Sequence, residues 1–248
     1  MPVGDADALE LGEFESVRPI AEADLVLSLG GDGTMLRSVR MLEGAPVPVL
    51  GVNLGSLGYL TQVEPDRLTD ALDRFVAGPE AGAWTLDQRM MLDVAVNGEL
   101  IGRALNEAVV EKAESGHTVR LLARIDGEPF TYYAADGLIV ATPTGSTAYS
   151  LSARGPVVSP RHRAMLLTPV SPHMLFDRTL VLDPTETIEI EVSGHRVAEL
   201  VLDGRPVAPL DDGDVVRCTP SESTANFVRL DAEYYHQILK AKFGLADR

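Results

Sequence analysis

The sequence predicts an α/β domain followed by a mostly β domain, with a helix near the carboxyl end. Up to about residue 80, short apolar runs alternate with segments of helical spacing, which is typical of a parallel sheet covered by helices. After a break at residues 78–83, apolar residues alternate and Asn-Gly or Asp-Gly pairs recur, which is typical of β-hairpins. We therefore expect domains at residues 1–82 and 83–225, and a helical tail at 226–248 that packs back on the first domain.

The first domain is expected to contain two strands and two helices. A buried strand at residues 25–29 leads into a helix at 34–43, and a strand at 47–52 ends in a glycine-rich loop. The next helix, at 65–77, is expected to bury one face, made of Leu68, Leu72, Phe75 and Val76. Both glycine loops follow the carboxyl end of a strand, where ligands bind in such sheets. We therefore expect the two loops to face the same crevice.

The clearest signal in the second domain is a hairpin, in which Asn97-Gly98 separates the apolar runs 91–96 and 99–101. Further turns are expected at Asp126-Gly127, Asp203-Gly204 and Asp212-Gly213. Strands are expected at 119–125, 179–182, 187–192 and 200–202, and another apolar strand precedes the turn at Pro143. The tail is expected to form a helix at 232–243.

Composition restricts the classes of partner. The 248 residues are 45% hydrophobic, which suffices for a core without disulfides. A net charge of −16 argues against nucleic acid and anionic membranes, because both attract basic surfaces. No apolar run reaches the length of a membrane span and the first residues do not resemble a signal peptide, so we expect a cytoplasmic protein. The single cysteine, Cys218, lies in a strand-like segment and is expected to be a buried structural thiol.

The segment Gly30-Gly31-Asp32-Gly33-Thr34 lies where a strand turns into a helix. Glycines at such a turn let backbone N–H groups approach an anion, and the amino end of the helix adds a favourable potential. A carboxylate beside bound phosphate requires a metal ion or a substrate hydroxyl between them, which is the arrangement that phosphoryl transfer needs. Taken alone, the segment is equally compatible with a tight turn capped by Asp32.

A second unusual stretch runs from Asp136 to Ser152, where an apolar strand enters a turn rich in hydroxyl groups. Hydroxyls and backbone amides suit the uncharged parts of a nucleotide, and Tyr149 is placed to border a base. The alternative is a loop in which Ser146 or Thr147 caps the next helix.

Other polar residues have two interpretations each. Asp136 is either an ordinary turn residue or an acid placed for function. Asn106 and Glu107 have apolar neighbours, and they either point into a cleft or end a strand in solvent. His117 and His173 have no partner at metal-ligand spacing. The Walker, dinucleotide-fingerprint, zinc-protease and Gly-x-Ser-x-Gly motifs are absent from the sequence.

The order of these motifs resembles that of the ATP-dependent NAD kinases over roughly residues 24–230. The resemblance is carried by Gly30–Thr34, Gly51–Leu60, Leu105–Glu107, and Asp136-Gly137 followed by Thr142–Tyr149. Gly-Gly-Asp-Gly-Thr alone also occurs in lipid kinases of the diacylglycerol type, and a close variant occurs in 6-phosphofructokinases, so the combination is the specific signal. The resemblance implies a Rossmann-like first domain and transfer of the γ-phosphate of ATP to the 2′-hydroxyl of the adenosine ribose of NAD.

The resemblance also implies cofactors, partners and residue roles. Members need a divalent metal, usually Mg²⁺, some accept polyphosphate as donor, and they form homodimers or homotetramers in which both subunits line the NAD site. Asp32 would activate the 2′-hydroxyl. Phosphate and ATP would be bound by Gly30, Gly31, Gly33, Thr34 and Arg37. NAD would be bound by Asn106, Glu107, His117, Asp136, Thr147, Ala148, Tyr149, Ser152 and Arg205, and no residue is assigned to a metal.

The chain departs from the family pattern at its start. Members usually have a further strand and helix before the region that begins here near residue 10, so we expect a chain that is naturally short or whose start is assigned too late, with an exposed sheet edge. Two other functions compete. A lipid kinase is disfavoured by the acidity and by the hydroxyl-rich loop, and a non-enzymatic NAD or NADP sensor would not need Asp32, Gly33, Thr34 and Arg37.

Overall fold

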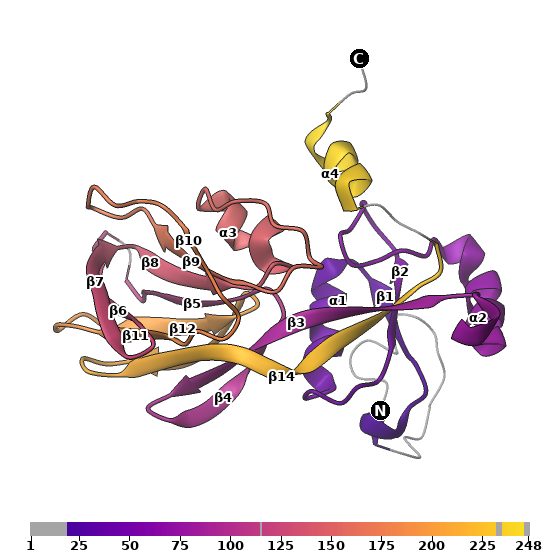
Figure 1. Ribbon diagram of the computed structural model, residues 1–248, viewed down its shortest axis with the longest axis horizontal. Helices are drawn as coiled ribbons and strands as arrows, with labels where there is room; N and C mark the ends of the chain where they lie inside the picture. The colour runs from indigo at the N-terminus through magenta and orange to yellow at the C-terminus, as the bar shows by residue number, and fades with distance from the viewer. Residues whose placement is uncertain (1–18, 115, 232–234, 246–248) are drawn as a thin grey trace. The chain divides into compact units, whose positions relative to one another are not determined.

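The computed structural model describes residues 19–114, 116–231 and 235–245 (Figure 1). By its internal contacts the chain divides into two compact units. The first unit comprises the described parts of residues 1–87 and 226–248, and the second comprises residues 88–225. The domain boundaries expected at residues 82 and 225 stay predictions.

The first unit contains the expected alternation of strands and helices. Strand β1 (Val26–Gly30) precedes helix α1 (Asp32–Met41), and strand β2 (Val49–Asn53) precedes helix α2 (Leu68–Ala77). The strands β1 and β2 are parallel, with Val26 opposite Val49, and α1 lies against both (Figure 1). Short 3₁₀ helices occur at η2 (Ile20–Glu22), η3 (Pro65–Arg67) and η4 (Pro79–Ala81). The helix α1 begins two residues before the expected one, so Asp32 is its first residue.

Helix α2 buries only part of the face that the sequence indicated. Ala71 is its fully buried residue, and Leu68 and Phe75 pack against the same core around Leu50. Val76, expected on this face, is 84% exposed, so that part of the prediction was wrong. The turn at Gly78 follows directly. Phe75 stacks on Trp84 with ring centroids 5.1 Å apart, and this contact fixes the rotation of the helix about its axis.

The carboxyl-terminal part of the chain returns to the first unit. Strand β14 (Val215–Arg229) extends past residue 225, and Phe227 pairs in parallel with Val49 of β2. The predicted tail helix is α4 (Tyr235–Phe243), while residues 232–234 of that prediction lie outside the described residues. Residues 226–229, expected in the helical tail, are therefore strand.

The second unit is built from two sheets. One contains β4 (Glu99–Ala104), β3 (Thr85–Val96), β14, β11 (Ile188–Val192), β6 (Val119–Ile125) and β7 (Glu128–Ala135) in this order of pairing. The other contains β10 (Leu180–Leu182), β9 (Met165–Val170), β8 (Gly137–Ala141), β5 (Glu107–Lys112), β12 (Ala198–Leu202) and β13 (Arg205–Leu210). Between β8 and β9 lie the short helices η5 (Gly145–Thr147) and α3 (Tyr149–Ser152). The mostly β character predicted for this region is confirmed.

The predicted hairpin turns are confirmed by backbone geometry. Asn97 and Gly98 have φ values of 51° and 87°, as a type I′ turn between β3 and β4 requires. The two sheets of the second unit share one core, which includes Leu121 of β6 and Leu138 of β8. Cys218 is fully buried in this core, and burial raises the pKa of its thiol to about 12, which confirms its structural role. None of the described helices is long and apolar enough to cross a membrane.

Candidate active site

Asp32 joins the two glycine loops of the first unit. Its Oδ2 atom accepts a hydrogen bond from the backbone N–H of Tyr59, and its Oδ1 atom accepts one from the N–H of Leu60, both at 2.9 Å. The acid of the first loop is thus held by the backbone of the loop that follows β2. The prediction that the two loops lie together is confirmed.

Gly58 permits this close approach. A Cβ atom at Gly58 would lie 2.4 Å from Asp32 Oδ1 and 2.6 Å from Thr61 Oγ1, so a side chain there would displace one of these groups. Leu60 is also held through its carbonyl, which accepts a 3.0 Å hydrogen bond from Arg229. Because Arg229 also pairs with Asp87 at 3.0 Å and is nearly buried, the turn that orients Asp32 has a rigid support.

The amino end of α1 provides a surface for an anion. Gly30 ends β1, Gly31 is the N-cap residue, and Gly33 and Thr34 belong to the first turn. A Cβ atom at Gly31 or Gly33 would meet nothing within 4 Å, so the space beside their Cα atoms is open. The first N–H groups of a helix have no partner inside the helix, and they carry a positive partial charge. Arg37 is exposed one turn further along α1.

Tyr59 links this site to helix α4. Its ring lies under the Lys242 ammonium group, with 4.4 Å between Nζ and the ring centroid. Burial and, secondarily, the charge of Asp32 raise the pKa of the Tyr59 hydroxyl. Carboxylate, aromatic ring and ammonium group are therefore close neighbours within the first unit.

In the second unit, strand register assembles the site around the start of β5. Glu107 lies opposite Ala141 of β8, and Ala108 lies opposite Leu202 of β12. The residues that follow these two partner strands, Thr142 and Asp203, are thereby brought beside Asn106 and Glu107. This is why residues from three separate stretches of sequence share one site.

Asp203 holds the Asn106–Glu107 backbone. Its carboxylate accepts hydrogen bonds from the N–H groups of Leu105 at 2.9 Å, Asn106 at 2.7 Å and Glu107 at 3.1 Å. In return, the Asp203 N–H donates to the Glu107 carbonyl at 3.0 Å. A carboxylate with several backbone donors is a strong anchor, so the conformation of this segment is fixed.

The hydroxyl-rich turn closes on the same segment. Thr142 N–H donates to the Asn106 carbonyl at 2.8 Å, and the Thr142 hydroxyl donates to the Leu105 carbonyl at 2.6 Å. A Cβ atom at Gly145 would lie only 2.0 Å from the Asn106 carbonyl oxygen. Glycine is therefore required where the turn passes over Asn106.

Glu107 is buried, with 5% of its surface exposed, so the interpretation of Asn106-Glu107 as a solvent-exposed strand end was wrong for this residue. Its pKa is raised from 4.5 to about 8, chiefly by desolvation and then by the charge of Asp203, while the Tyr149 N–H lowers it. Within the described part of the chain, its Oε2 atom has no hydrogen-bond partner. A buried oxygen of this kind is available to a ligand.

Tyr149 lies near the other charged residues of the site. The pKa of its hydroxyl is raised, first by desolvation and then by the charges of Glu111, Asp136 and Glu107, while Lys112 lowers it. Asp136 forms an ion pair with Lys112 at 2.5 Å, which places the acid at a strand end with a fixed partner. The structure thus groups Glu107, Asp136 and Tyr149.

The other candidate residues differ in their surroundings. Thr147 and Ala148 are half-buried in the hydroxyl-rich turn, and Ser152 is exposed at the end of α3. His117, between β5 and β6, and Arg205, at the start of β13, are both exposed, and among the described residues neither forms a hydrogen bond or ion pair with Glu107.

The interpretation of Ser146 or Thr147 as a helix cap was wrong. Neither η5 nor α3 has a side-chain cap. The Ser146 hydroxyl instead donates to the Pro143 carbonyl at 2.7 Å and accepts from the Val158 N–H at 3.0 Å.

Six residues support the candidate site although the sequence predicts no such role for them: Gly58, Arg229, Thr142, Gly145, Lys112 and Asp203. For Asp203 the sequence predicts only a turn. Its Asp-Gly pair looks like those at Asp126 and Asp212, and only the pairing of β12 with β5 distinguishes it.

The pKa of Glu107 predicts a dependence of stability on pH. The folded protein keeps this proton up to about pH 8, whereas the unfolded chain loses it near its ordinary value of 4.5. The stabilisation is complete below the unfolded pKa and is lost as pH rises through the folded one, by at most about 1.4 kcal/mol per pH unit. The wild type should therefore lose stability relative to Glu107→Gln, so that the melting temperature of the variant minus that of the wild type increases from about pH 5 to pH 8. The exposed Glu99→Gln is the control, and parallel curves for Glu107→Gln and the wild type would contradict the expectation.

Comparison with known proteins agrees with this arrangement. Residues 13–80 match the family model of the ATP-NAD kinase N-terminal domain, and residues 105–230 match that of the C-terminal domain. The NAD kinase of Heliobacterium modesticaldum is 41% identical over 228 residues, which are 90% of this chain and 79% of that protein. The NAD kinase of Nocardia farcinica is 39% identical over 98% of this chain and 75% of its own length.

Solved structures give the same result. A crystal structure of yeast NADH kinase complexed with NADH superposes with a TM-score of 0.84 at 30% identity, covering 91% of this chain and 68% of that one. The NAD kinase of Archaeoglobus fulgidus in complex with ATP has a TM-score of 0.74 at 29% identity, covering 92% of this chain and 85% of that one. By both domains and by these relatives, the chain belongs to the ATP-NAD kinase family.

Proposed function

We propose how this chain carries out the reaction of its family, the phosphorylation of NAD by ATP to NADP. Asp32 receives the proton of the 2′-hydroxyl of the adenosine ribose, and the amino end of α1 binds phosphate. The observation that carries this assignment is the Asp32 carboxylate, held at the start of α1 by the amides of Tyr59 and Leu60.

The chemistry requires placement more than a strong base. Phosphoryl transfer passes through a loose transition state, so the protein contributes mainly alignment and charge neutralisation. A carboxylate is a weak base for a ribose hydroxyl, but it accepts the proton as the new P–O bond makes that hydroxyl acidic. Gly31 and Gly33 supply backbone donors, Thr34 supplies its hydroxyl, and Arg37 supplies a positive charge for the transferred group.

Mg²⁺ is proposed to be held mainly by the phosphates of ATP. Among the described residues, no three His, Cys, Asp or Glu side chains group closely enough to hold an ion. Mg²⁺ is commonly bound through substrate phosphates and water with one or two carboxylates. When bound it neutralises charge on the transferring phosphoryl group.

NAD is proposed to bind through the second unit. The unpaired Oε2 of Glu107 and the side chain of Asn106 recognise polar groups of the dinucleotide, and Tyr149 borders it. The Thr147, Ala148 and Ser152 turn faces the adenosine side, and Asp136, held by Lys112, faces the nicotinamide side. His117 and Arg205 stay predictions without a supporting contact.

The direct test is an assay of the purified protein with ATP, Mg²⁺ and NAD, in which an NADP-specific dehydrogenase detects the product. We expect NADP to form. Replacing ATP by polyphosphate, and NAD by NADH, then identifies the preferred donor and acceptor. Binding of NADP to a folded protein that makes none would instead favour the sensor.

Gly58→Ala is expected to lower kcat about tenfold to a hundredfold, because its Cβ atom would displace the Asp32 carboxylate or the Thr61 side chain. Gly55→Ala is a matched control in the same loop, where a Cβ atom meets nothing within 4 Å. Steady-state kinetics of both variants measure this difference in kcat. Equal activity of the two would contradict the role assigned to Gly58.

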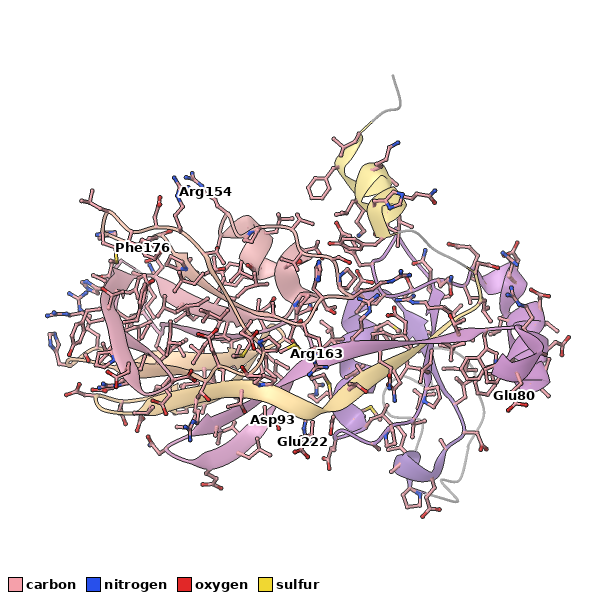
Figure 2. The ribbon with its side chains drawn as sticks, in the orientation of Figure 1. Glu80, Asp93, Arg154, Arg163, Phe176 and Glu222 are labelled. Carbon is pink, nitrogen blue, oxygen red and sulfur yellow. The ribbon has the colours of Figure 1, made fainter. Side chains whose placement is uncertain are left out.

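Self-association and a cytoplasmic location stay predictions. Exposed apolar side chains in the second unit support self-association: Phe130 and Tyr132 on β7, and Leu175 and Phe176 after β9. Phe176, labelled in Figure 2, packs edge to face on Phe130 with ring centroids 5.7 Å apart. Light scattering on the purified protein would distinguish monomer, dimer and tetramer.

A further inference from the structure

Thr61 carries a buried hydroxyl with no assigned role. Only 5% of the residue is exposed, and among the residues that the structure describes its Oγ1 atom has no hydrogen-bond partner. An unpaired buried hydroxyl is costly, because folding removes its bonds to water without replacing them. We therefore expect its hydrogen-bond partner to be a water molecule, a substrate or a neighbouring polar side chain.

The nearest relevant neighbour is the Asp32 carboxylate. The Cβ position of Gly58 lies 2.6 Å from Thr61 Oγ1 and 2.4 Å from Asp32 Oδ1, so these oxygens are at most about 5 Å apart. One water molecule spans such a distance, and a small shift of the turn would allow a direct bond. Because Gly58 has no side chain, both oxygens can lie against its backbone.

The backbone around Thr61 is fixed, so its side chain has a defined place. Gln62 and Val63 both donate their N–H groups to the Gly51 carbonyl of β2 at 3.1 Å. A Cβ atom at Gly51 would lie 3.0 Å from Thr61 Cα, which shows how closely the segment packs on the strand. The backbone that carries the Thr61 side chain is thus held firmly on β2.

We propose that Thr61 is a positioning residue for the phosphoryl transfer: its hydroxyl donates a hydrogen bond to Asp32 Oδ1 in the working enzyme, directly or through one water. The Tyr59 and Leu60 amides fix the carboxylate from one side, and Thr61 supplies a third donor. This inference rests on the proposed function of Asp32. The hydroxyl favours the charged form of the carboxylate, which is the form that accepts the ribose proton.

The test compares Thr61→Val, which keeps the shape but removes the hydroxyl, with Thr61→Ser, which keeps the hydroxyl. For Thr61→Val we expect kcat to fall about fivefold to twentyfold and the acid limb of the kcat–pH profile to move to higher pH. The KM values for NAD and ATP should change less than about twofold, and Thr61→Ser should restore most of kcat and the wild-type profile. Other ionisable groups at this turn among the described residues include Tyr59, whose ring lies under Lys242, and Arg229, which donates to the Leu60 carbonyl and pairs with Asp87.

Ser28→Ala is the matched control. The Ser28 hydroxyl is also buried without a partner among the described residues, and Ser28 lies opposite Gly51, but Gly58 does not connect it to Asp32. We expect its kinetics to stay within about twofold of the wild type. A lower kcat in Thr61→Val with an unmoved acid limb, or an equal defect in Thr61→Ser, would indicate lost packing and overturn the inference.

A crystal structure of the wild-type protein gives a readout besides activity. It should place Thr61 Oγ1 within hydrogen-bond distance of Asp32 Oδ1 or of one water bound to it. A hydroxyl bonded elsewhere would refute the inference even if the kinase assay fails. Conversely, an active wild type with a fully active Thr61→Val variant would refute this inference alone, and an inactive wild type would refute the proposed function.

Discussion

Asp32→Asn is expected to lower kcat for NAD phosphorylation by about a hundredfold or more. The amide cannot accept the proton of the 2′-hydroxyl. The carboxylate accepts hydrogen bonds from the N–H groups of Tyr59 and Leu60 with its two oxygens. In the amide, an NH₂ group replaces one of these oxygens, so one of the two hydrogen bonds is lost. Both effects reduce transition-state stabilisation, and the residual rate reflects binding and alignment by the remaining groups.

Steady-state kinetics with ATP, Mg²⁺ and NAD check this expectation. Asp24→Asn, which changes an exposed acid just before β1, is the control for the loss of one charge in the same unit. The KM for NAD should change by only a few-fold, since Asn106, Glu107 and Tyr149 are untouched. An unchanged kcat in a folded Asp32→Asn protein would remove Asp32 from the mechanism.

Gly145→Ala is expected to raise the KM for NAD at least about tenfold and to lower the free energy of unfolding by about 1–3 kcal/mol or more. The new Cβ atom would lie 2.0 Å from the Asn106 carbonyl oxygen and 2.7 Å from its Cα atom. Both are backbone atoms held by Asp203 and Thr142, so they cannot yield without breaking those hydrogen bonds. Asn106 and the hydroxyl-rich turn would therefore separate.

Thermal melting and steady-state kinetics of the same preparation measure both effects. Gly102→Ala is the control in the second unit, because its Cβ atom would meet only the terminal Cδ1 atom of the Leu202 side chain, at 3.2 Å. It should lose much less stability and keep the wild-type KM. A Gly145→Ala protein with wild-type melting temperature and KM would show that the turn can move away from Asn106.

The fold class was predictable because its signals are local. The turn between β3 and β4 requires two positive φ angles, which Asn97 and Gly98 adopt readily and most residues do not. The hairpin was therefore predictable from neighbouring residues alone. The buried face of α2 was predicted less well. Val76 fits the helical spacing, but it is exposed because the contacts of Phe75 with Trp84 and of Ala71 with the core decide how the helix lies.

By itself the sequence determined the α/β and β organisation, the strand-to-helix position of Asp32 and, through the order of its motifs, the resemblance to NAD kinases. The tertiary structure decided which interpretation of each polar residue holds. Glu107 is buried with a raised pKa because β5 runs between β8 and β12, which brings Asp203 beside it from 96 residues away in the chain. Asp32 is oriented because a loop 27 residues further on turns two amides toward it. Hydrogen bonds and charges act over a few ångströms in space, so residues distant in sequence acquire their roles only when strand register and loop packing bring them together.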